Sequence, residues 1–226
     1  MGKRIIKYIK KLLYCLIELI YSGDDKCVIC NEYGDENEAL CVQCRKKLRH
    51  SGDSFYLCHN DEEYLVWSVF YYSNIVKELI IRLKYKSDFI CGEILASYML
   101  ELVKKNGLQF DLLAYVPMTK RALRNRGYNQ SEFLANYISK SLNIPVICNL
   151  IKILDTKDQI GLGEEERWNN MEKCFAIKES KLIRNKNILL VDDVITTGAT
   201  TFHCAHCLKK SGVGNVYILT IAKSKV

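Results

Sequence analysis

Two adjacent acids followed at once by hydroxyl-bearing residues form the part of this sequence best suited to chemistry. In the stretch NILLVDDVITTGATT, an apolar run leads into Asp192 and Asp193, and a short turn-like segment comes next. That segment contains Thr196, Thr197, Gly198, Ala199 and Thr200. Backbone amides at the start of a helix bind phosphate, and carboxylates accept hydrogen bonds from sugar hydroxyls. The stretch therefore predicts a site for a ribose 5-phosphate, with the ester in the turn and the hydroxyls on the acids.

A plainer interpretation treats the threonines as an ordinary helix cap. Capping accounts for one threonine, but it leaves the acid pair and the other hydroxyls unexplained. A nucleotide-binding P-loop is not indicated, because the sequence contains no G-x-x-x-x-G-K-[ST] pattern. Neighbouring residues of a strand point to opposite faces, so we expect the chain to turn at the acids if both are to bind one ligand.

Four cysteines near the N-terminus have the spacing of a metal site. Cys27, Cys30, Cys41 and Cys44 form a C-x2-C-x10-C-x2-C pattern, and two such turns can place four thiolates tetrahedrally around Zn²⁺. Scattered thiols or a disulfide pair are the alternatives. A short polar segment without a core of its own needs a stabilising cross-link such as a bound metal, which favours zinc. Because protein ligands fill all four positions, we predict a structural site and not a catalytic one.

Two further cysteine motifs carry weaker signals. Cys204 and Cys207 fall with His203 inside a predicted helix, where small thiols are expected to pack against the sheet as buried hydrophobes. Cys58 and His59 would need partners that the sequence does not supply, so they receive no role.

Alternating strands and helices must deliver these residues to one place. Strands are expected over residues 64–72, 111–117, 187–191 and 216–222, and helices over 74–84, 88–105, 130–141 and 198–211. This alternation predicts an α/β fold with a largely parallel sheet flanked by helices. Ligands bind such sheets beyond the carboxyl ends of the strands, where VDDVITTGATT and VPMTK both lie. We expect three parts: an amphipathic N-terminal helix (1–23), a zinc-binding module (24–60) and the α/β domain (61–226).

Composition favours a reduced, cytoplasmic protein. The 226 residues include 11 cysteines, an odd number that suits free and metal-bound thiols better than a disulfide scaffold. The net charge is +7, but residues 3–11 supply five of the positive charges, so a general nucleic-acid-binding surface is only weakly indicated. Residues 1–21 have apolar residues at helical spacing and are too short to span a bilayer. This helix either packs on the protein's own body or makes peripheral contact with an anionic membrane surface.

Several motifs of the chain resemble known families. VDDVITTGATT resembles the 5-phosphoribosyl-1-diphosphate (PRPP) binding motif of type I phosphoribosyltransferases. Other segments resemble one branch, the ComF family of competence-associated proteins, which join an N-terminal zinc module to a phosphoribosyltransferase-like domain. YVPMTKRALRNRGYNQSEFLA (115–135) resembles that family's VP…R…RG-[FY]-NQ segment, and DQIGLGEEERWNNMEKCF (158–175) resembles its Q…L…R…N…F segment. The resemblance covers nearly everything from residue 27 to residue 226.

The resemblance implies roles for individual residues. Asp192 and Asp193 would hold the ribose hydroxyls, and the threonine-rich turn would hold the 5-phosphate. A basic loop after the Val-Pro pair would bind diphosphate together with Mg²⁺, through Lys120, Arg121, Arg124 and Arg126. Residues of a mobile loop would close over the site, namely Gln159, Arg167 and Asn170.

Two functions of different class follow from this resemblance. In one, the protein binds PRPP or a related phosphoribosyl ligand and works in DNA uptake during natural competence, with a helicase on incoming single-stranded DNA. Tyr115 and Tyr128 are then candidate stacking platforms for bases. In the other, it is an active phosphoribosyltransferase that transfers ribose 5-phosphate from PRPP to an unknown nitrogen acceptor. The motif supports ligand binding in both cases and does not decide whether turnover occurs.

Overall fold

The chain divides into two units, which meet between residues 47 and 48. The computed structural model describes residues 26–34, 38–153, 168, 171 and 174–224. The expected N-terminal helix and the loop residues Gln159, Arg167 and Asn170 lie outside this part of the chain. Among the described residues, no helix combines the length and the apolar character needed to cross a membrane.

The small unit is held together by backbone hydrogen bonds around its cysteines. The amide of Asn31 donates to the carbonyl of Cys27 at 2.9 Å, and Asn31 takes a left-handed φ of 58° that closes the first turn. The amide of Val28 donates to the carbonyl of Ala39 at 2.9 Å and so joins the two cysteine turns. The helix α2 (Val42–Lys46) begins after Cys41.

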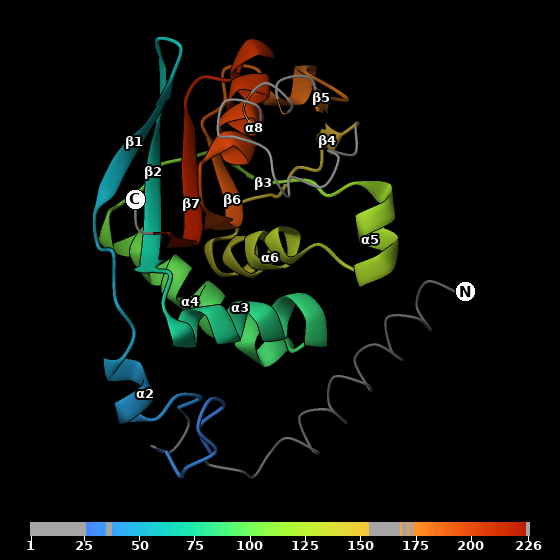
Figure 1. Cartoon of the computed structure of the whole chain (residues 1–226). Helices are drawn as coiled ribbons and strands as arrows, with labels where there is room; N and C mark the ends of the chain where they lie inside the picture. The colour runs from blue at the N-terminus through green and yellow to red at the C-terminus, as the bar shows by residue number, and fades with distance from the viewer. Residues whose placement is uncertain (1–25, 35–37, 154–167, 169–170, 172–173, 225–226) are drawn as a thin grey trace. The chain divides into compact units, whose positions relative to one another are not determined.

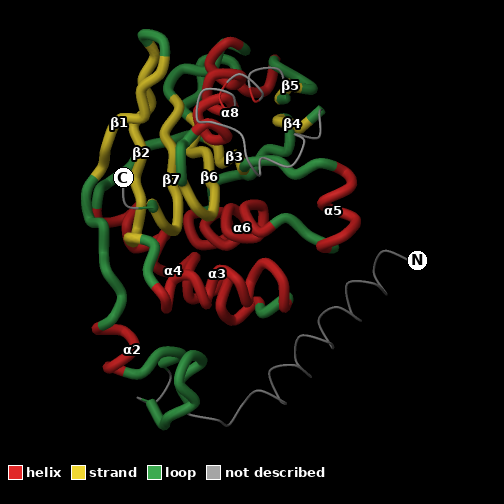
Figure 2. Tube along the Cα trace, viewed as in Figure 1, coloured by secondary structure: helices red, strands yellow, loops and turns green. Residues whose placement is uncertain are grey.

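A five-stranded sheet forms the centre of the larger unit (Figures 1 and 2). The strands lie in the order β1-β2-β7-β6-β3. They are β1 (Ser54–His59), β2 (Glu62–Tyr71), β3 (Leu112–Tyr115), β6 (Ile188–Ile195) and β7 (Val216–Lys223). All neighbouring pairs are parallel except β1 and β2, which form an antiparallel hairpin. The predicted largely parallel α/β sheet is thus confirmed, and the carboxyl ends of β3 and β6 meet at one edge.

The edge strand β1 corrects the expected boundary of the zinc-binding module. Sequence analysis placed residues 54–59 in that module, but they pair with β2 along their whole length. Leu57 is the one buried residue of β1, as expected for an edge strand that has neighbours on one side only. A single buried position gives no apolar periodicity, which is why the strand was not recognised.

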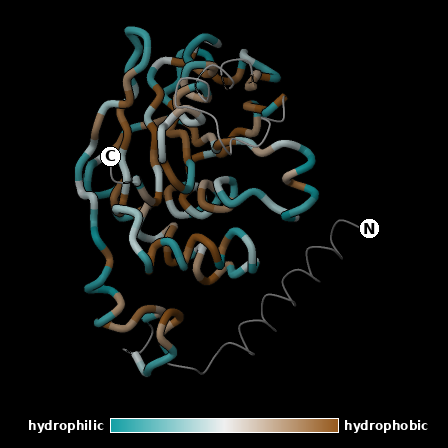
Figure 3. The backbone as a smooth tube through the Cα atoms, viewed as in Figure 1, coloured by the Kyte–Doolittle hydropathy of each residue, from teal (hydrophilic) through white to brown (hydrophobic). Residues whose placement is uncertain are grey.

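Helices cover the sheet in two groups (Figure 1). α3 (Asn74–Lys86), α4 (Phe89–Lys105) and α6 (Gln130–Leu142) pack against one another. α8 (Ala199–Lys210) packs against β6 and β7, together with the small hairpin of β4 (Leu150–Lys152) and β5 (Phe175–Ile177). The core between α8 and the sheet contains Ile188, Leu190, Ile218, Phe202 and Leu208. Figure 3 shows the same central strands as a continuous hydrophobic region.

Two local differences from the predicted elements bear on the site. Residues 120–126 were expected to be a loop, but they form the helix α5 (Lys120–Arg126), which starts with Thr119 Oγ1 accepting a hydrogen bond from the amide of Ala122 at 3.2 Å. None of its residues is buried, so no apolar stripe marked it in the sequence. The strand expected to end at residue 191 continues to Ile195.

Candidate ligand-binding site

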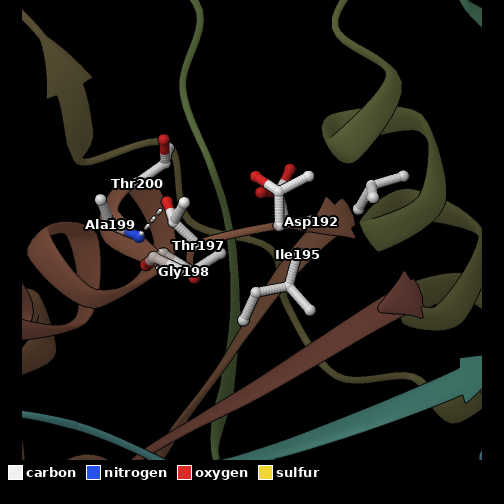
Figure 4. A pocket seen from close by; sticks show the side chains of 9 residues that line it. Asp192, Ile195, Thr197, Gly198, Ala199 and Thr200 are labelled. Carbon is white, nitrogen blue, oxygen red and sulfur yellow. Dashed lines mark hydrogen bonds between the residues drawn. The ribbon is translucent and has the colours of Figure 1, made fainter. Parts of the chain in front are cut away.

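A small pocket lies where β6 ends and α8 begins (Figure 4). Its volume is about 70 Å³, and it is lined by Asp192 and residues 194–201. Gly198 is the N-cap of α8, and no side chain caps this helix there. The first amides of a helix have no partner within the helix, and the helix dipole favours negative charge beside them. The pocket is therefore suited to a group of phosphate size. Of its threonines, Thr197 accepts a long hydrogen bond of 3.5 Å from the amide of Ala199, so capping accounts for one threonine and leaves the other hydroxyls of the turn unexplained.

Gly198 is needed in this turn for two reasons. Its φ of +83° lies in the left-handed region, where glycine has no steric penalty. A Cβ at this position would also lie 2.5 Å from Cδ1 of Leu57 on β1. The edge strand thus supports the phosphate-sized pocket from behind, which the sequence did not indicate.

The two acids do not point to the same place. β6 does not turn between Asp192 and Asp193, so their side chains leave opposite faces of the strand. Asp192 lines the pocket. Asp193 is absent from the lining, and its Oδ2 lies 2.7 Å from Nζ of Lys84 on α3. We expected both carboxylates to hold one ligand, and this geometry brings only Asp192 to it.

The environment of Asp192 makes its carboxyl hard to ionise. Ser131 Oγ donates a hydrogen bond to Asp192 Oδ1 at 3.0 Å, and the amide of Asp193 donates to the same atom at 2.9 Å. Burial, followed by repulsion from Asp193, raises the pKa of Asp192 to about 7. The two hydrogen bonds and Lys84 act in the opposite direction. This carboxyl therefore changes its charge near neutral pH.

Sequence analysis did not single out Lys84. It stands in the segment RLKYKSD among other basic residues at the end of a helix, where cations are common. A weak signal was present, because Lys84 follows the buried Ile80 by four residues and so adjoins the apolar face of α3. Burial disfavours the charged form of Lys84, but Asp193 outweighs this and raises the Lys84 pKa.

A larger cavity of about 700 Å³ lies beside α5, at the end of β3. Of the predicted diphosphate-binding residues, Lys120, Arg121 and Arg124 line it, and Lys152 and Lys178 add further cations. Its apolar lining includes Pro117, Leu123 and Ile153. The cavity therefore combines positive charge with apolar surface.

Two residues expected in this region point elsewhere. Arg126 donates a hydrogen bond to Gln130 Oε1, and its guanidinium lies 5.2 Å from the centre of the Tyr85 ring. Tyr128 packs on Phe89 with their ring centres 5.1 Å apart, and it is absent from the cavity lining. Tyr115 does line the cavity, so only one of the two candidate stacking residues is placed there.

The four predicted metal ligands converge in the small unit. The Sγ atoms of Cys27, Cys30, Cys41 and Cys44 all lie within 4.8 Å of one another, and no other group of this kind occurs among the described residues. Burial opposes ionisation of Cys27, but backbone hydrogen bonds lower its pKa to about 6. Burial and the neighbouring thiols raise the pKa of Cys44 to about 12. Thiols crowded in this way fit a soft divalent cation, whose charge removes the repulsion between thiolates.

The other cysteine motifs behave as packing elements. Cys204, on α8, is fully buried in the core between that helix and the sheet, as predicted, and burial raises its pKa well above the usual value. Cys58 is exposed on β1, and the neighbouring His59 stacks on Trp168 with ring centres 4.2 Å apart. His59 therefore holds the ring of Trp168 at the end of β1.

The fold and the site together define a class of protein. This chain has a four-cysteine module followed by an α/β unit with a small pocket at the end of a central strand. Competence protein F of Haemophilus influenzae is 28% identical, across 82% of this chain and 90% of that protein. Competence protein ComFC of Bacillus subtilis is 27% identical, across 82% of this chain and 73% of its own. The DNA utilization protein YhgH of Escherichia coli K12 is 26% identical, across 88% and 90%.

The chain is thus a homologue of the ComF-type competence proteins, as its motifs indicated. No protein-family model matches it. Solved structures with a similar arrangement include glutamine PRPP amidotransferase of B. subtilis, at 18% identity and a TM-score of 0.40 over 57% of this chain. This chain spans 25% of that enzyme. Adenine phosphoribosyltransferase of Leishmania tarentolae matches 77% of this chain and 84% of its own, with 10% identity and a TM-score of 0.39.

Proposed function

We propose that this protein binds PRPP or a related phosphoribosyl ligand and acts in DNA uptake during natural competence. The observation that carries the ligand assignment is the pocket shared by the N-terminus of α8, the positive-φ Gly198 and the buried Asp192. The 5-phosphate would accept hydrogen bonds from the turn of residues 196–200, and the ribose hydroxyls would donate to Asp192. The role in competence is supported by the names of the relatives.

The diphosphate of such a ligand would lie toward α5. Lys120 and Arg121 line the cavity at the end of β3, which neighbours β6 in the sheet. Their charges suit a diphosphate, and Mg²⁺ bound to that diphosphate would neutralise the remainder. In the small unit, structural Zn²⁺ would be held by the four converging thiols.

Single-stranded DNA is the proposed macromolecular partner. The cavity beside α5 offers cations for phosphates and Tyr115 for stacking on a base. We place the protein in the cytoplasm with a helicase partner, where residues 1–21 would contact the membrane surface that incoming DNA crosses. Binding of this kind should weaken steeply with salt, because phosphate contacts release counterions.

Phosphoribosyl transfer is the second candidate function. The cavity of about 700 Å³ gives room for a nitrogen acceptor beside the pocket. In this reaction the bond from the anomeric carbon to the diphosphate oxygen breaks and a carbon–nitrogen bond forms. The attacking nitrogen loses its proton to solvent, and diphosphate leaves with its Mg²⁺.

Calorimetry with PRPP and Mg²⁺, followed by an assay of diphosphate release with a panel of bases, separates the two functions. Binding without release favours the ligand-binding competence protein, and base-dependent release favours the transferase. Asp192→Asn should weaken binding roughly 10- to 100-fold, as expected for hydrogen bonds to a charged group. No binding by the native protein at any pH between 6 and 9 would refute the ligand assignment.

A further inference from the structure

The last turn of α3 contacts one residue of the acid pair and one residue of the basic helix α5. Lys84 forms an ion pair with Asp193, and the two side chains are only 21% and 7% exposed. The next residue, Tyr85, lies under the guanidinium of Arg126 at the end of α5. One short segment, remote in sequence from β6, thus contacts Asp193 and the basic helix.

The ion pair solves an electrostatic problem that the acid pair creates. Two neighbouring carboxylates out of contact with water repel each other and lose hydration, so each disfavours ionisation of the other. Around Asp192, the charged and titratable groups are Asp193 on its own strand, Lys84 from α3 and Cys204 from α8. Ser131 from α6 contributes an uncharged hydroxyl, and Arg126 of α5 acts on Lys84. Lys84 is therefore the cation in this group that acts on both acids.

We propose that Lys84 is a positioning residue of the ligand site. By pairing with Asp193 on the side of β6 that faces α3, it offsets the negative charge of Asp193 and makes Asp192, the carboxylate of the pocket, easier to ionise when a ligand's hydroxyls bind. This inference rests on the proposed phosphoribosyl site for its functional meaning, and on the ion pair itself for its geometry.

The inference has a definite consequence for pH. A protonated carboxyl accepts hydrogen bonds from hydroxyls less well than a carboxylate does. Because the pKa of Asp192 is raised to about 7, affinity for a sugar phosphate should rise with pH through that region. Removing the positive charge of Lys84 would raise the Asp192 pKa further and move the rise in affinity to higher pH.

The test is a cycle of four proteins: native, Lys84→Met, Asp193→Asn and the double variant. Each is titrated with PRPP and Mg²⁺ from pH 5.5 to 9, and the Asp192 carboxyl is followed by carbon-13 NMR without ligand. Lys84→Met should move the midpoint of the Asp192 titration upward by about one pH unit or more. Asp193→Asn should move the same midpoint downward. The midpoint of the double variant should be close to that of the native protein. Lys86→Met, at an exposed lysine of the same helix, should change nothing.

Structural damage and loss of the proposed function are distinguishable from failure of this inference. Removing Lys84 alone leaves a buried unpaired charge and can unfold the protein, but the double variant replaces the whole pair with neutral groups. An Asp192 midpoint that is the same in the native protein, Asp193→Asn and the double variant would overturn the role of Lys84. If NMR shows the expected shifts but PRPP does not bind, the positioning role stands and the phosphoribosyl assignment fails.

Discussion

The two sites of this protein are built in opposite ways. The cysteine cluster takes all four thiols from residues 27–44, so its ligands are already close along the chain. The ligand pocket takes Asp192 and its turn from β6 and α8, while Ser131 comes from α6 and Lys84 reaches the acid pair from α3. One bound cation would be enough to organise the first site, whereas the second requires the sheet and its helices to have folded.

Removal of the metal should produce the largest effect and should be confined to the small unit. Cys44→Ser takes away one of four thiols, so zinc content should fall from roughly one per chain toward none. Zinc sites of this type contribute on the order of 10 kcal/mol to the folding of their module. Metal analysis and hydrogen exchange of residues 26–47 would measure this loss, while the sheet should keep its protection. Cys58→Ser is the matched control, because Cys58 is exposed and outside the cluster. Stoichiometric zinc in Cys44→Ser would contradict the assignment.

Gly198→Ala should affect the larger unit alone: it should damage the pocket and leave the cysteine cluster intact. The new Cβ meets Leu57 at 2.5 Å and sits at a φ of +83°, so backbone strain and overpacking together should cost about 2 to 4 kcal/mol. Denaturant unfolding and PRPP titration would measure the losses of stability and of affinity. Gly107→Ala is the control, since Gly107 also has a positive φ of +60° but nothing within 4 Å. It should lose about 1 kcal/mol and keep full ligand affinity. Equal losses in the two variants would mean that Leu57 does not support the turn.

The same contrast explains what could be predicted from sequence. The cysteine spacing and the turn of residues 196–200 are local patterns, and both were placed correctly on their elements. The partner of Asp193 was not predictable in this way, because Lys84 meets it through the packing of α3, more than a hundred residues away along the chain. The helix α5 and the strand β1 were missed for a related reason. Each buries at most one residue, so tertiary contacts determine their structure and leave little apolar periodicity in the sequence.

Within the larger unit, two ligands distinguish the contribution of the basic helix α5 to binding from that of the turn of residues 196–200. Lys120→Gln combined with Arg121→Gln removes two charges from the cavity beside α5. Affinity for PRPP should fall about tenfold or more, whereas affinity for ribose 5-phosphate, which lacks the diphosphate, should change little. Calorimetry with both ligands measures the difference, and Lys104→Gln with Lys105→Gln at the end of α4 controls for net charge. A uniform loss for both ligands would show that α5 contacts the part they share.

A further expected effect concerns the pH dependence of stability and the carboxyl that the sheet buries. The pKa of Asp192 is raised from 3.8 to about 7, so the folded state binds a proton more readily than the unfolded chain does. The contribution of Asp192 to the free energy of unfolding therefore falls as pH rises from about 4 to about 7. Asp192→Asn should remove that fall. Urea unfolding at pH 5 and pH 8 measures this. Between the two pH values, the free energy of unfolding of the variant should increase by about 1 to 3 kcal/mol relative to that of the native protein. Asp53→Asn, at an exposed acid, should run parallel to the native protein. If the stability of Asp192→Asn had the same pH dependence as that of the native protein, the charge of Lys84 would already stabilise both carboxylates. The two faces of β6 would then form one electrostatic unit, and the ligand would meet a carboxylate that is ionised at every pH where the protein is folded.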